Sequence, residues 1–391
     1  CEAACVLGIP GASDPVAIKL VEVEIIDRAF AAGTVTPRPA PQPSGRRVAV
    51  VGSGPAGLAG AQQLARAGHQ VTVYERDDAP GGLLRYGIPD FKLEKHHLDR
   101  RVAQLEAEGV RFVTGCAVGR DIGVDVLRAG SDAVLLAGGA LNGRDMVATP
   151  GRSRAGIHLA MTYLTGANRH VGGLVSTAPI DAAGRRVVII GGGDTAADCL
   201  GTAHRQGAAG VVQLDIYPQP PSTRDVERDP WPTWPWILRS YPAHEEGGER
   251  VFAVAVQEFL GEERVRAVRV VEVNVRRQAD RRVVTPMPGT TRDLPADLVL
   301  LAIGFDGTEE GPLLDQLGLA RTPTGTLACG PDWQTEVPGV FVAGDMHRGA
   351  SLIVWAIAEG RAAAAAIHAY LGAPGSLPAP VTPATRPLVA G

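Results

Sequence analysis

Short runs of apolar residues recur along the chain, and each is followed by a small-residue turn and then by an amphipathic stretch. Residues 48–51 form the first such run, a helix-period stretch reaches Arg66, and a second run covers residues 71–74. Continuous apolar runs of this length are typical of parallel strands buried on both faces. The pattern therefore predicts an α/β fold with parallel sheets.

A glycine motif follows the first run. Gly52 would permit the tight turn, Gly54 would let a pyrophosphate approach the backbone, and Gly57 would let the helix pack closely on the strand. Glu75 ends the second run, 18 residues after Gly57, where an acid can bind an adenosine ribose. A strand, a helix and an acid at this spacing predict a dinucleotide site. Its loop comprises Gly52, Gly54, Pro55, Ala56 and Gly57.

The same pattern returns at residues 187–216, where Asp215 takes the acidic position 19 residues after Ala196. Two such units in one chain indicate two dinucleotides. This arrangement is typical of flavin reductases, whereas a simple dehydrogenase carries one unit. The residues expected to cradle the second dinucleotide are Gly191, Gly192, Gly193, Asp194, Thr195 and Ala196.

Further buried-strand runs cover residues 133–140, 296–304 and 339–345, and the first two end in small residues. Asp345 follows Gly344 where the last of these runs meets a turn, and a helix is predicted to start near Ser351 and Trp355. In two-dinucleotide reductases an Asp in such a turn binds the ribityl chain, and the helix directs its positive end at the flavin. We therefore expect Asp345, Ser351 and Trp355 to position the flavin for catalysis.

Composition limits the kinds of macromolecule that the protein can bind and the cellular compartment in which it works. The net charge is −4, with acids and bases interspersed, so the chain has no polybasic stripe for nucleic acid or an anionic membrane. No apolar run approaches the roughly 18 residues that span a bilayer. After Cys1 and Cys5 the cysteines are scattered singly, which favours a reducing cytoplasm. His96 and His97 fall in a charged helix and are expected to be solvated.

Three segments are more specific than the glycine motifs. They are GGLLRYGIPDFKLEK (81–95), the block at 217–252 that contains PWPTWPW, and AGDMHRGASLIVWAIAEGR (343–361). With these segments the chain resembles, over residues 1–371, the small subunit of glutamate synthase. The resemblance implies FAD in the first unit, NAD(P)H in the second, and a large subunit or fused large domain that makes glutamate from glutamine and 2-oxoglutarate. The three Trp residues of PWPTWPW would pack the loop or dock that partner.

The resemblance also assigns residues. By position, Gly81, Gly82 and Leu83 would line FAD, and Lys92 would lie near the flavin ring and join the residues that position it for catalysis. Ala302 and Gly304 would flank the nicotinamide side.

Iron–sulfur binding is the point at which the chain departs from the family. Family members begin with a helical domain that ligates two [4Fe–4S] clusters, and Cys1 and Cys5 match its last two cysteines. Two thiolates cannot complete a four-thiolate cluster, so we expect the clusters only in an untruncated protein.

The expected architecture is a Rossmann-like FAD domain interrupted by an NAD(P)H domain. A remnant of the iron–sulfur domain (1–35) and a Pro-rich linker (36–45) come first. The first segment of the FAD domain (46–142), the NAD(P)H domain (143–299) and the second segment of the FAD domain (300–371) follow. A Pro-rich tail (372–391), expected to be disordered, ends the chain. The alternatives are a related electron-input subunit, of the dihydropyrimidine dehydrogenase or ferredoxin:NADP reductase type, and an inactive nucleotide-binding scaffold.

The acid of the second unit bears on the choice of nicotinamide cofactor. Asp215 can bond a ribose 2′-OH but would repel a 2′-phosphate, and no arginine follows it until Arg224. The sequence therefore favours NADH. NADPH stays open, because Arg224 or Arg205 could fold back over the adenosine.

Overall fold

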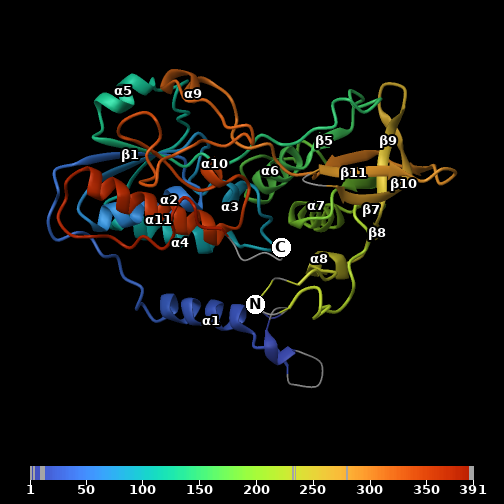
Figure 1. Ribbon diagram of the computed structural model, residues 1–391, viewed down its shortest axis with the longest axis horizontal. Helices are drawn as coiled ribbons and strands as arrows, with labels where there is room; N and C mark the ends of the chain where they lie inside the picture. The colour runs from blue at the N-terminus through green and yellow to red at the C-terminus, as the bar shows by residue number, and fades with distance from the viewer. Residues whose placement is uncertain are drawn as a thin grey trace.

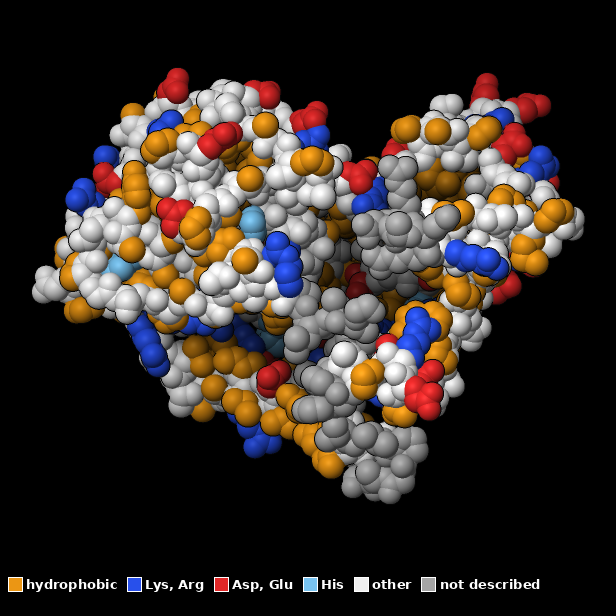
Figure 2. Space-filling model, in the orientation of Figure 1, with side chains coloured by type: hydrophobic (Ala, Val, Ile, Leu, Met, Phe, Trp, Pro, Cys, Tyr) orange, Lys and Arg blue, Asp and Glu red, His pale blue; other side chains and the backbone are white. Residues whose placement is uncertain are grey.

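The computed structural model describes residues 2, 5–8, 14–230, 233, 235–278 and 281–386, and these residues form two lobes side by side (Figure 1). A hollow separates the lobes on the face seen in Figure 2. Each lobe contains a parallel sheet of five strands, which confirms the predicted α/β class with two dinucleotide-binding units.

The first lobe, on the left in Figure 1, is a three-layer sandwich. Its parallel sheet has the order β14-β4-β1-β2-β3, with β1 Arg47–Val51, β2 Gln70–Tyr74, β3 Arg111–Val113, β4 Ala133–Leu136 and β14 Val340–Val342. One face packs against α2 (Pro55–Arg66), α4 (Lys95–Ala107) and α11 (Ile353–Tyr370). The other packs against α5 (Val124–Ala129) and α9 (Pro312–Leu317). Both faces are therefore buried, as the continuous apolar runs require.

The second lobe repeats this plan with one change. Its parallel sheet has the order β5-β13-β6-β7-β8, with β5 Ile157–Leu159, β6 Arg186–Ile190, β7 Gly210–Leu214, β8 Glu249–Val251 and β13 Leu298–Leu301. Helices α6 (Ala160–Val171) and α7 (Asp194–Arg205) cover one face. The other face is covered by an antiparallel sheet of β9 (Val254–Gly261), β10 (Val265–Gln278), β11 (Arg281–Pro286) and β12 (Arg292–Pro295).

The expected domain boundary between residues 299 and 300 is wrong, because it falls inside strand β13. The strand lies between β5 and β6, and Val299 is opposite Val188 in the register. All four residues of β13 are buried, so the apolar run belongs to one sheet and cannot be shared between lobes. The chain returns to the first lobe after Leu301.

The antiparallel sheet was not among the expectations, although β10 alternates valine with polar residues in the manner of a half-buried strand. Short helices complete the fold: η2 Val6–Gly8, α3 Leu83–Tyr86, α8 Pro242–Glu245 and α10 Asp345–Arg348. No helix among the described residues is long and apolar enough to cross a membrane.

The expectation of a disordered tail is wrong for residues 372–386. Val381 packs against the core of the first lobe, and the Pro378 carbonyl accepts a hydrogen bond from Gln63 Nε2 (2.9 Å). The Thr385 carbonyl accepts another from Arg348 Nη2 (3.0 Å). An extended Pro-rich segment can be ordered in this way because side-chain donors of the helices beneath it satisfy its carbonyls.

Helix α1 (Ile18–Ala31) lies below the first lobe in Figure 1 and has no buried residue. The C-terminal part of α1 contacts α4. Asp27 of α1 accepts a hydrogen bond from Arg100 of α4 (2.6 Å), and the ring of Phe30 lies 4.0 Å from the same guanidinium. This helix lies within residues 1–35, where a remnant of the iron–sulfur domain was expected.

Candidate functional site

The first glycine loop, residues 52–57, has the geometry that the motif predicted. Gly52 has φ +100°, and a Cβ atom there would stand 2.5 Å from the Ala137 carbonyl oxygen. A Cβ atom on Gly57 would clash with the Gly52 carbonyl. A Cβ atom on Gly54, the N-cap of α2, would meet nothing within 4 Å. Open space at a helix N-terminus fits a pyrophosphate.

Glu75 is buried, and its carboxylate anchors this loop. It accepts hydrogen bonds from the Ser53 N–H (3.0 Å), the Ser53 hydroxyl and the Asp77 N–H (2.9 Å). Ser53 Oγ in turn accepts a hydrogen bond from the Gly81 N–H (2.8 Å). A Cβ atom on Gly82 would stand 3.1 Å from Gly54 Cα. The segment at 81–83 therefore lies against the first glycine loop, and its contact with FAD stays a prediction.

The second glycine loop, residues 191–196, repeats the geometry at the start of α7. Gly191 has φ +136°, and a Cβ atom there would clash with the Ala302 carbonyl, which places Ala302 against this loop. A Cβ atom on Gly193 would meet nothing within 4 Å, and Ala196 is fully buried. The second loop therefore leaves the same open cradle at a helix N-terminus.

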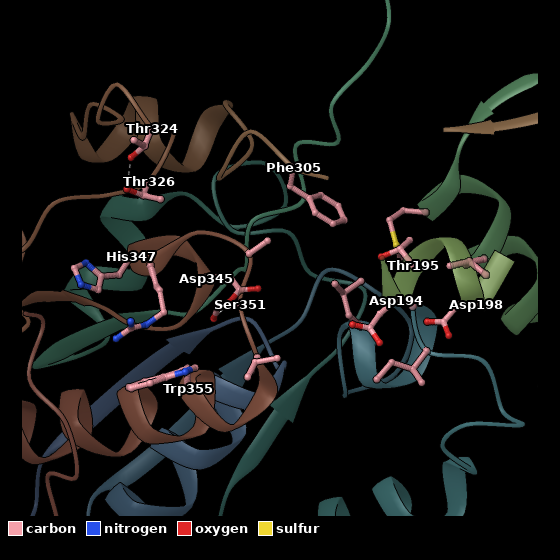
Figure 3. A pocket seen from close by; sticks show the side chains of 18 of the residues that line it. Asp194, Thr195, Asp198, Phe305, Thr324, Thr326, Asp345, His347, Ser351 and Trp355 are labelled. Carbon is pink, nitrogen blue, oxygen red and sulfur yellow. Dashed lines mark hydrogen bonds between the residues drawn. The ribbon is translucent and has the colours of Figure 1, made fainter. Parts of the chain in front are cut away.

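A cavity of about 830 Å³ lies between the lobes. Asp345, Ser351 and Trp355 line its first-lobe side, and Asp194, Thr195 and Asp198 of α7 line the opposite side (Figure 3). Leu83 also contributes to the lining. The structure thus brings residues predicted for the flavin and residues predicted for the nicotinamide cofactor to one space.

Sequence reasoning missed several residues of the cavity wall: Phe305, Thr324, Thr326, His347, Arg348 and Arg386. His347 and Arg348 lie inside the AGDMHRGAS segment, so a search of that segment for polar side chains could have found them. The two threonines and Arg386 come from segments without a motif, and only folding brings them to the cavity.

Asp345 has an unusual electrostatic environment. Burial raises its pKa to about 6, and the nearby negative charge of Glu359 acts in the same direction. The hydrogen bond from Ser351 Oγ to Asp345 Oδ1 (2.9 Å) opposes this shift, because it stabilises the carboxylate. Asp345 is therefore a carboxyl group that can be ionised or protonated near neutral pH.

Lys92 forms an ion pair across the lobes. Its Nζ atom lies 2.7 Å from Asp198 Oδ1 of α7 and 5.3 Å from the ring centroid of Tyr241. Burial raises the pKa of Asp198, and Lys92 opposes that shift. Lys92 thus holds a residue of the cavity wall in addition to any contact it makes with a flavin.

The two arginines that could have offset the charge of Asp215 are engaged elsewhere. Arg224 Nη1 donates to the carbonyls of Asp229 (2.7 Å) and Thr233 (3.2 Å), within its own loop. Arg205 donates to both carboxylate oxygens of Glu246 (2.5 and 2.8 Å). The expected role of Arg224 in cofactor binding finds no support in this conformation, because its guanidinium is turned into the loop.

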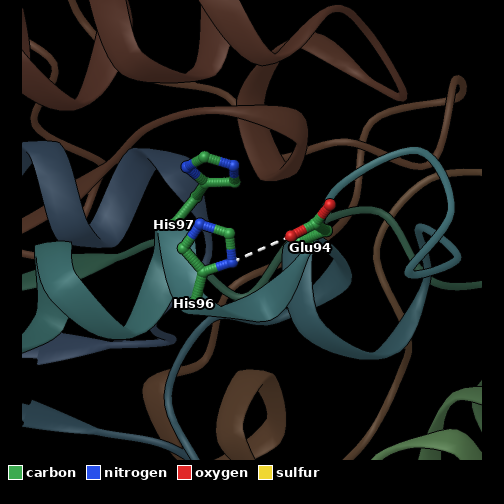
Figure 4. Close-up of side chains that lie close together, drawn as sticks. All are labelled: Glu94, His96 and His97. Carbon is green, nitrogen blue, oxygen red and sulfur yellow. Dashed lines mark ion pairs between the residues drawn. The ribbon is translucent and has the colours of Figure 1, made fainter. Parts of the chain in front are cut away.

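Glu94, His96 and His97 lie close together at the start of α4 (Figure 4). His96 is exposed and lies 3.1 Å from Glu94, whereas His97 is half-buried and lies 3.6 Å from Asp27 of α1. The expectation of two solvated histidines therefore holds for His96 only.

The cysteines and the tryptophans of PWPTWPW lie outside the cavity lining wherever the structure describes them. Cys5, Cys116, Cys199 and Cys329 are free thiols, and Cys199 is buried. Cys1, Trp231 and Trp234 lie outside the described residues. Trp236 is 37% exposed and lies under the guanidinium of Arg228 (4.1 Å). Of the two expected cluster ligands the structure describes Cys5 alone, and a single thiol does not make a cluster site.

Comparison with known proteins agrees with this geometry. The pyridine nucleotide-disulphide oxidoreductase family matches residues 46–360. The glutamate synthase [NADPH] small chain of Mycobacterium tuberculosis H37Rv is 57% identical over 394 residues, which cover 99% of this chain and 79% of the relative. The glutamate synthase [NADH] of Schizosaccharomyces pombe is 41% identical, with 92% of this chain and 18% of the relative covered.

Among solved structures, FprA of M. tuberculosis in complex with NADPH has a TM-score of 0.65 at 20% identity, with 84% of this chain and 85% of that chain covered. At that identity the likeness concerns the fold alone. The sequence matches carry the assignment, since they extend over nearly the whole chain. The chain belongs to the glutamate synthase small-chain family, within the pyridine nucleotide-disulphide oxidoreductases.

Proposed function

We propose that this chain oxidises NADH at the cavity between the lobes, through FAD held by the first lobe, and passes the electrons to a glutamate synthase large subunit. Family membership makes it an NAD(P)H-dependent FAD oxidoreductase. One observation carries the residue assignment: Asp345 and Ser351 face Asp194 and Thr195 across a single cavity. A flavin and a nicotinamide must meet face to face to react.

The residues of the first lobe would hold FAD. When bound, FAD accepts a hydride from reduced nicotinamide and can release the electrons one at a time. The first glycine loop would bind the pyrophosphate at the N-terminus of α2, and Glu75 would bind the adenosine ribose. Asp345, oriented by Ser351, would bind the ribityl chain, and Trp355 would shield the flavin side of the cavity from water. These groups orient the cofactor, and none has to act as an acid or a base.

The second glycine loop and the start of α7 would hold the nicotinamide cofactor, with Lys92 keeping Asp198 in place beside it. The names of the relatives include both NADPH and NADH, so family membership does not identify the nicotinamide cofactor. We favour NADH because Asp215 lies at the adenosine end of this loop and neither Arg205 nor Arg224 is turned towards it.

The electron acceptor would be a large subunit, or a large domain fused to the same chain. The description of the bacterial relatives as small chains supports the first arrangement, and the 18% coverage of the fission-yeast relative supports the second. Iron–sulfur clusters would contribute only where a longer N-terminal region supplies the missing thiolates. The free thiols of the described cysteines support a reducing cytoplasmic location.

The test is spectroscopic. We expect the purified chain to be yellow and to release FAD on denaturation, and we expect anaerobic NADH to bleach it. A colourless protein that takes up no added FAD would contradict the proposal. A yellow protein that neither NADH nor NADPH bleaches would support the alternative of an inactive nucleotide-binding scaffold, whereas bleaching by NADPH alone would contradict only the choice of NADH.

A further inference from the structure

Glu359 is a fully buried carboxylate in the middle of α11. Its Oε2 atom accepts a hydrogen bond from the Gly344 N–H (2.9 Å), and its Oε1 atom accepts one from Arg348 Nε (2.6 Å). A buried charge is costly unless it is paired and hydrogen-bonded. Both carboxylate oxygens are satisfied here, by the two ends of the turn that carries Asp345.

The hydrogen bond from the Gly344 N–H to Glu359 lies where three elements are closely packed. Gly344 has φ +70°, and a Cβ atom there would stand 2.7 Å from Ala56 Cβ in the first glycine loop. A Cβ atom on Gly360, next to Glu359, would clash with the Ala56 carbonyl. The turn, α11 and the start of α2 therefore meet at one place, one residue before Asp345.

Arg348 extends this network to two more elements. It is nearly buried, its guanidinium carbon lies 4.4 Å from the centroid of the Trp355 ring, and its Nη2 atom donates to the Thr385 carbonyl of the tail. The Arg348–Glu359 pair thus links the turn, the cavity residue Trp355 and the tail. Neither the glycine motifs nor the assigned flavin residues include this pair.

We propose that Glu359 is a positioning residue for the flavin, which holds the Gly344–Asp345 turn directly and Trp355 through Arg348. The inference rests on the proposed binding of FAD in the first lobe. Glu359 does not line the cavity, so it acts through its two partners. Its loss would let the turn reorient and would leave Arg348 buried without its charge partner.

A purely structural role is the competing explanation, and the chain offers a matched control. Glu108 and Arg66 also form a 2.6 Å ion pair in the first lobe, and the side chains of Glu108 and Glu359 are both 0% exposed. Glu108 accepts hydrogen bonds from the Arg38 N–H, Gln62 and Gln104. These contacts tie α4 to α2 and the linker, away from the turn.

The experiment compares Glu359→Gln with Glu108→Gln in the full chain. The readouts are the unfolding midpoint, the Kd of the apoprotein for FAD, and the visible spectrum and midpoint potential of the bound flavin. We expect both variants to unfold earlier than wild type. We expect only Glu359→Gln to weaken FAD binding, by about tenfold or more, because glutamine has one acceptor oxygen and cannot accept from both Gly344 and Arg348 as the carboxylate does. Only this variant should shift the flavin absorption band and the midpoint potential.

An unchanged Kd, spectrum and potential in Glu359→Gln would overturn the proposal, and so would equal weakening in Glu108→Gln. If Glu359→Gln does not fold, Arg348→Lys takes its place, because lysine can keep the charge pair but cannot span Glu359, Trp355 and Thr385 at once. A wild-type Kd and spectrum in Arg348→Lys would likewise overturn it. Wild-type protein that binds no FAD would instead refute the proposed function.

Discussion

The carboxylate of Asp215 lies directly over the backbone of Gly192 in the second glycine loop. It lies so close that a Cβ atom on Gly192 would clash with Asp215 Oδ2, and the Tyr217 N–H donates to the other oxygen (3.0 Å). The acid at the end of β7 is thereby held at the loop that would bind a dinucleotide, where it can accept a hydrogen bond from a ribose 2′-OH.

This relationship predicts a preference for NADH. A 2′-phosphate about 4 Å from Asp215 would cost about 1 kcal/mol in water and about 4 kcal/mol at an effective dielectric near 20. We therefore expect kcat/KM to favour NADH over NADPH by about 5-fold to about 1,000-fold. Asp215→Ser should reduce this preference, as measured with both cofactors and an artificial acceptor. A wild-type preference for NADPH that the variant leaves unchanged would show that Asp215 does not contact the ribose.

Gly54→Val should abolish FAD binding while the protein stays folded. A Cβ atom on Gly54 would meet no protein atom within 4 Å and the φ of this residue is −67°, so we expect the fold to accommodate a side chain there, but that side chain would occupy the pyrophosphate cradle. Gly57→Val is the contrasting variant, because its side chain would clash with the Gly52 carbonyl and destabilise the lobe. Flavin absorbance and circular dichroism distinguish the two outcomes. Normal FAD content in Gly54→Val would place the pyrophosphate elsewhere.

Mild acid should destabilise the first lobe through the buried histidine His69. His69 Nδ1 is hydrogen-bonded to Ser44 (2.8 Å) and its Nε2 to His368 (2.9 Å), and both histidines are 4% exposed. Burial lowers the pKa of His69 from 6.5 to about 4, and the neighbouring His368 and Arg46 act in the same direction. The folded state therefore holds the neutral form, so stability is full above pH 6.5 and falls as the pH drops towards 4.

The loss at His69 should reach up to about 3 kcal/mol, since one pKa unit corresponds to about 1.4 kcal/mol. Urea unfolding of wild type and His69→Gln between about pH 7.5 and about pH 4.5 measures it. Glutamine can donate and accept hydrogen bonds but cannot titrate, so the variant should have the smaller pH dependence. Identical pH profiles would contradict this prediction, because they would mean that folding does not change the pKa of His69.

Electron transfer should not require a thiol. Cys199 is buried on α7, and burial raises its pKa well above the ordinary value. Burial also raises the pKa of Cys329, to about 12, so neither side chain is a reactive thiolate. We expect the triple variant Cys116→Ala, Cys199→Ala, Cys329→Ala to keep NADH:dye reductase activity within about twofold of wild type, because alanine preserves the small buried volume. A folded variant whose flavin NADH no longer reduces would contradict this prediction.

The local features of the site could be predicted from the amino-acid sequence. Gly52, Gly54 and Gly57 could be assigned roles before the structure because a tight turn, an open approach and close helix packing depend on residues that lie within one turn of chain. The parallel sheets followed from the same local logic, since a run buried on both faces is apolar throughout. The position of Asp345 beside the cavity followed from its place at the end of a buried strand.

Which side chains become partners depends on how separate elements pack in the folded chain. Nothing in the spacing of Lys92 and Asp198, or of Arg348 and Thr385, indicates that they meet, because each contact forms where separate elements pack. The apolar run 298–301 could also not be assigned to a lobe, since either sheet would bury it equally well. The sequence pattern specifies what must be buried and where the backbone must turn, whereas the choice among equivalent partners depends on packing over the whole chain.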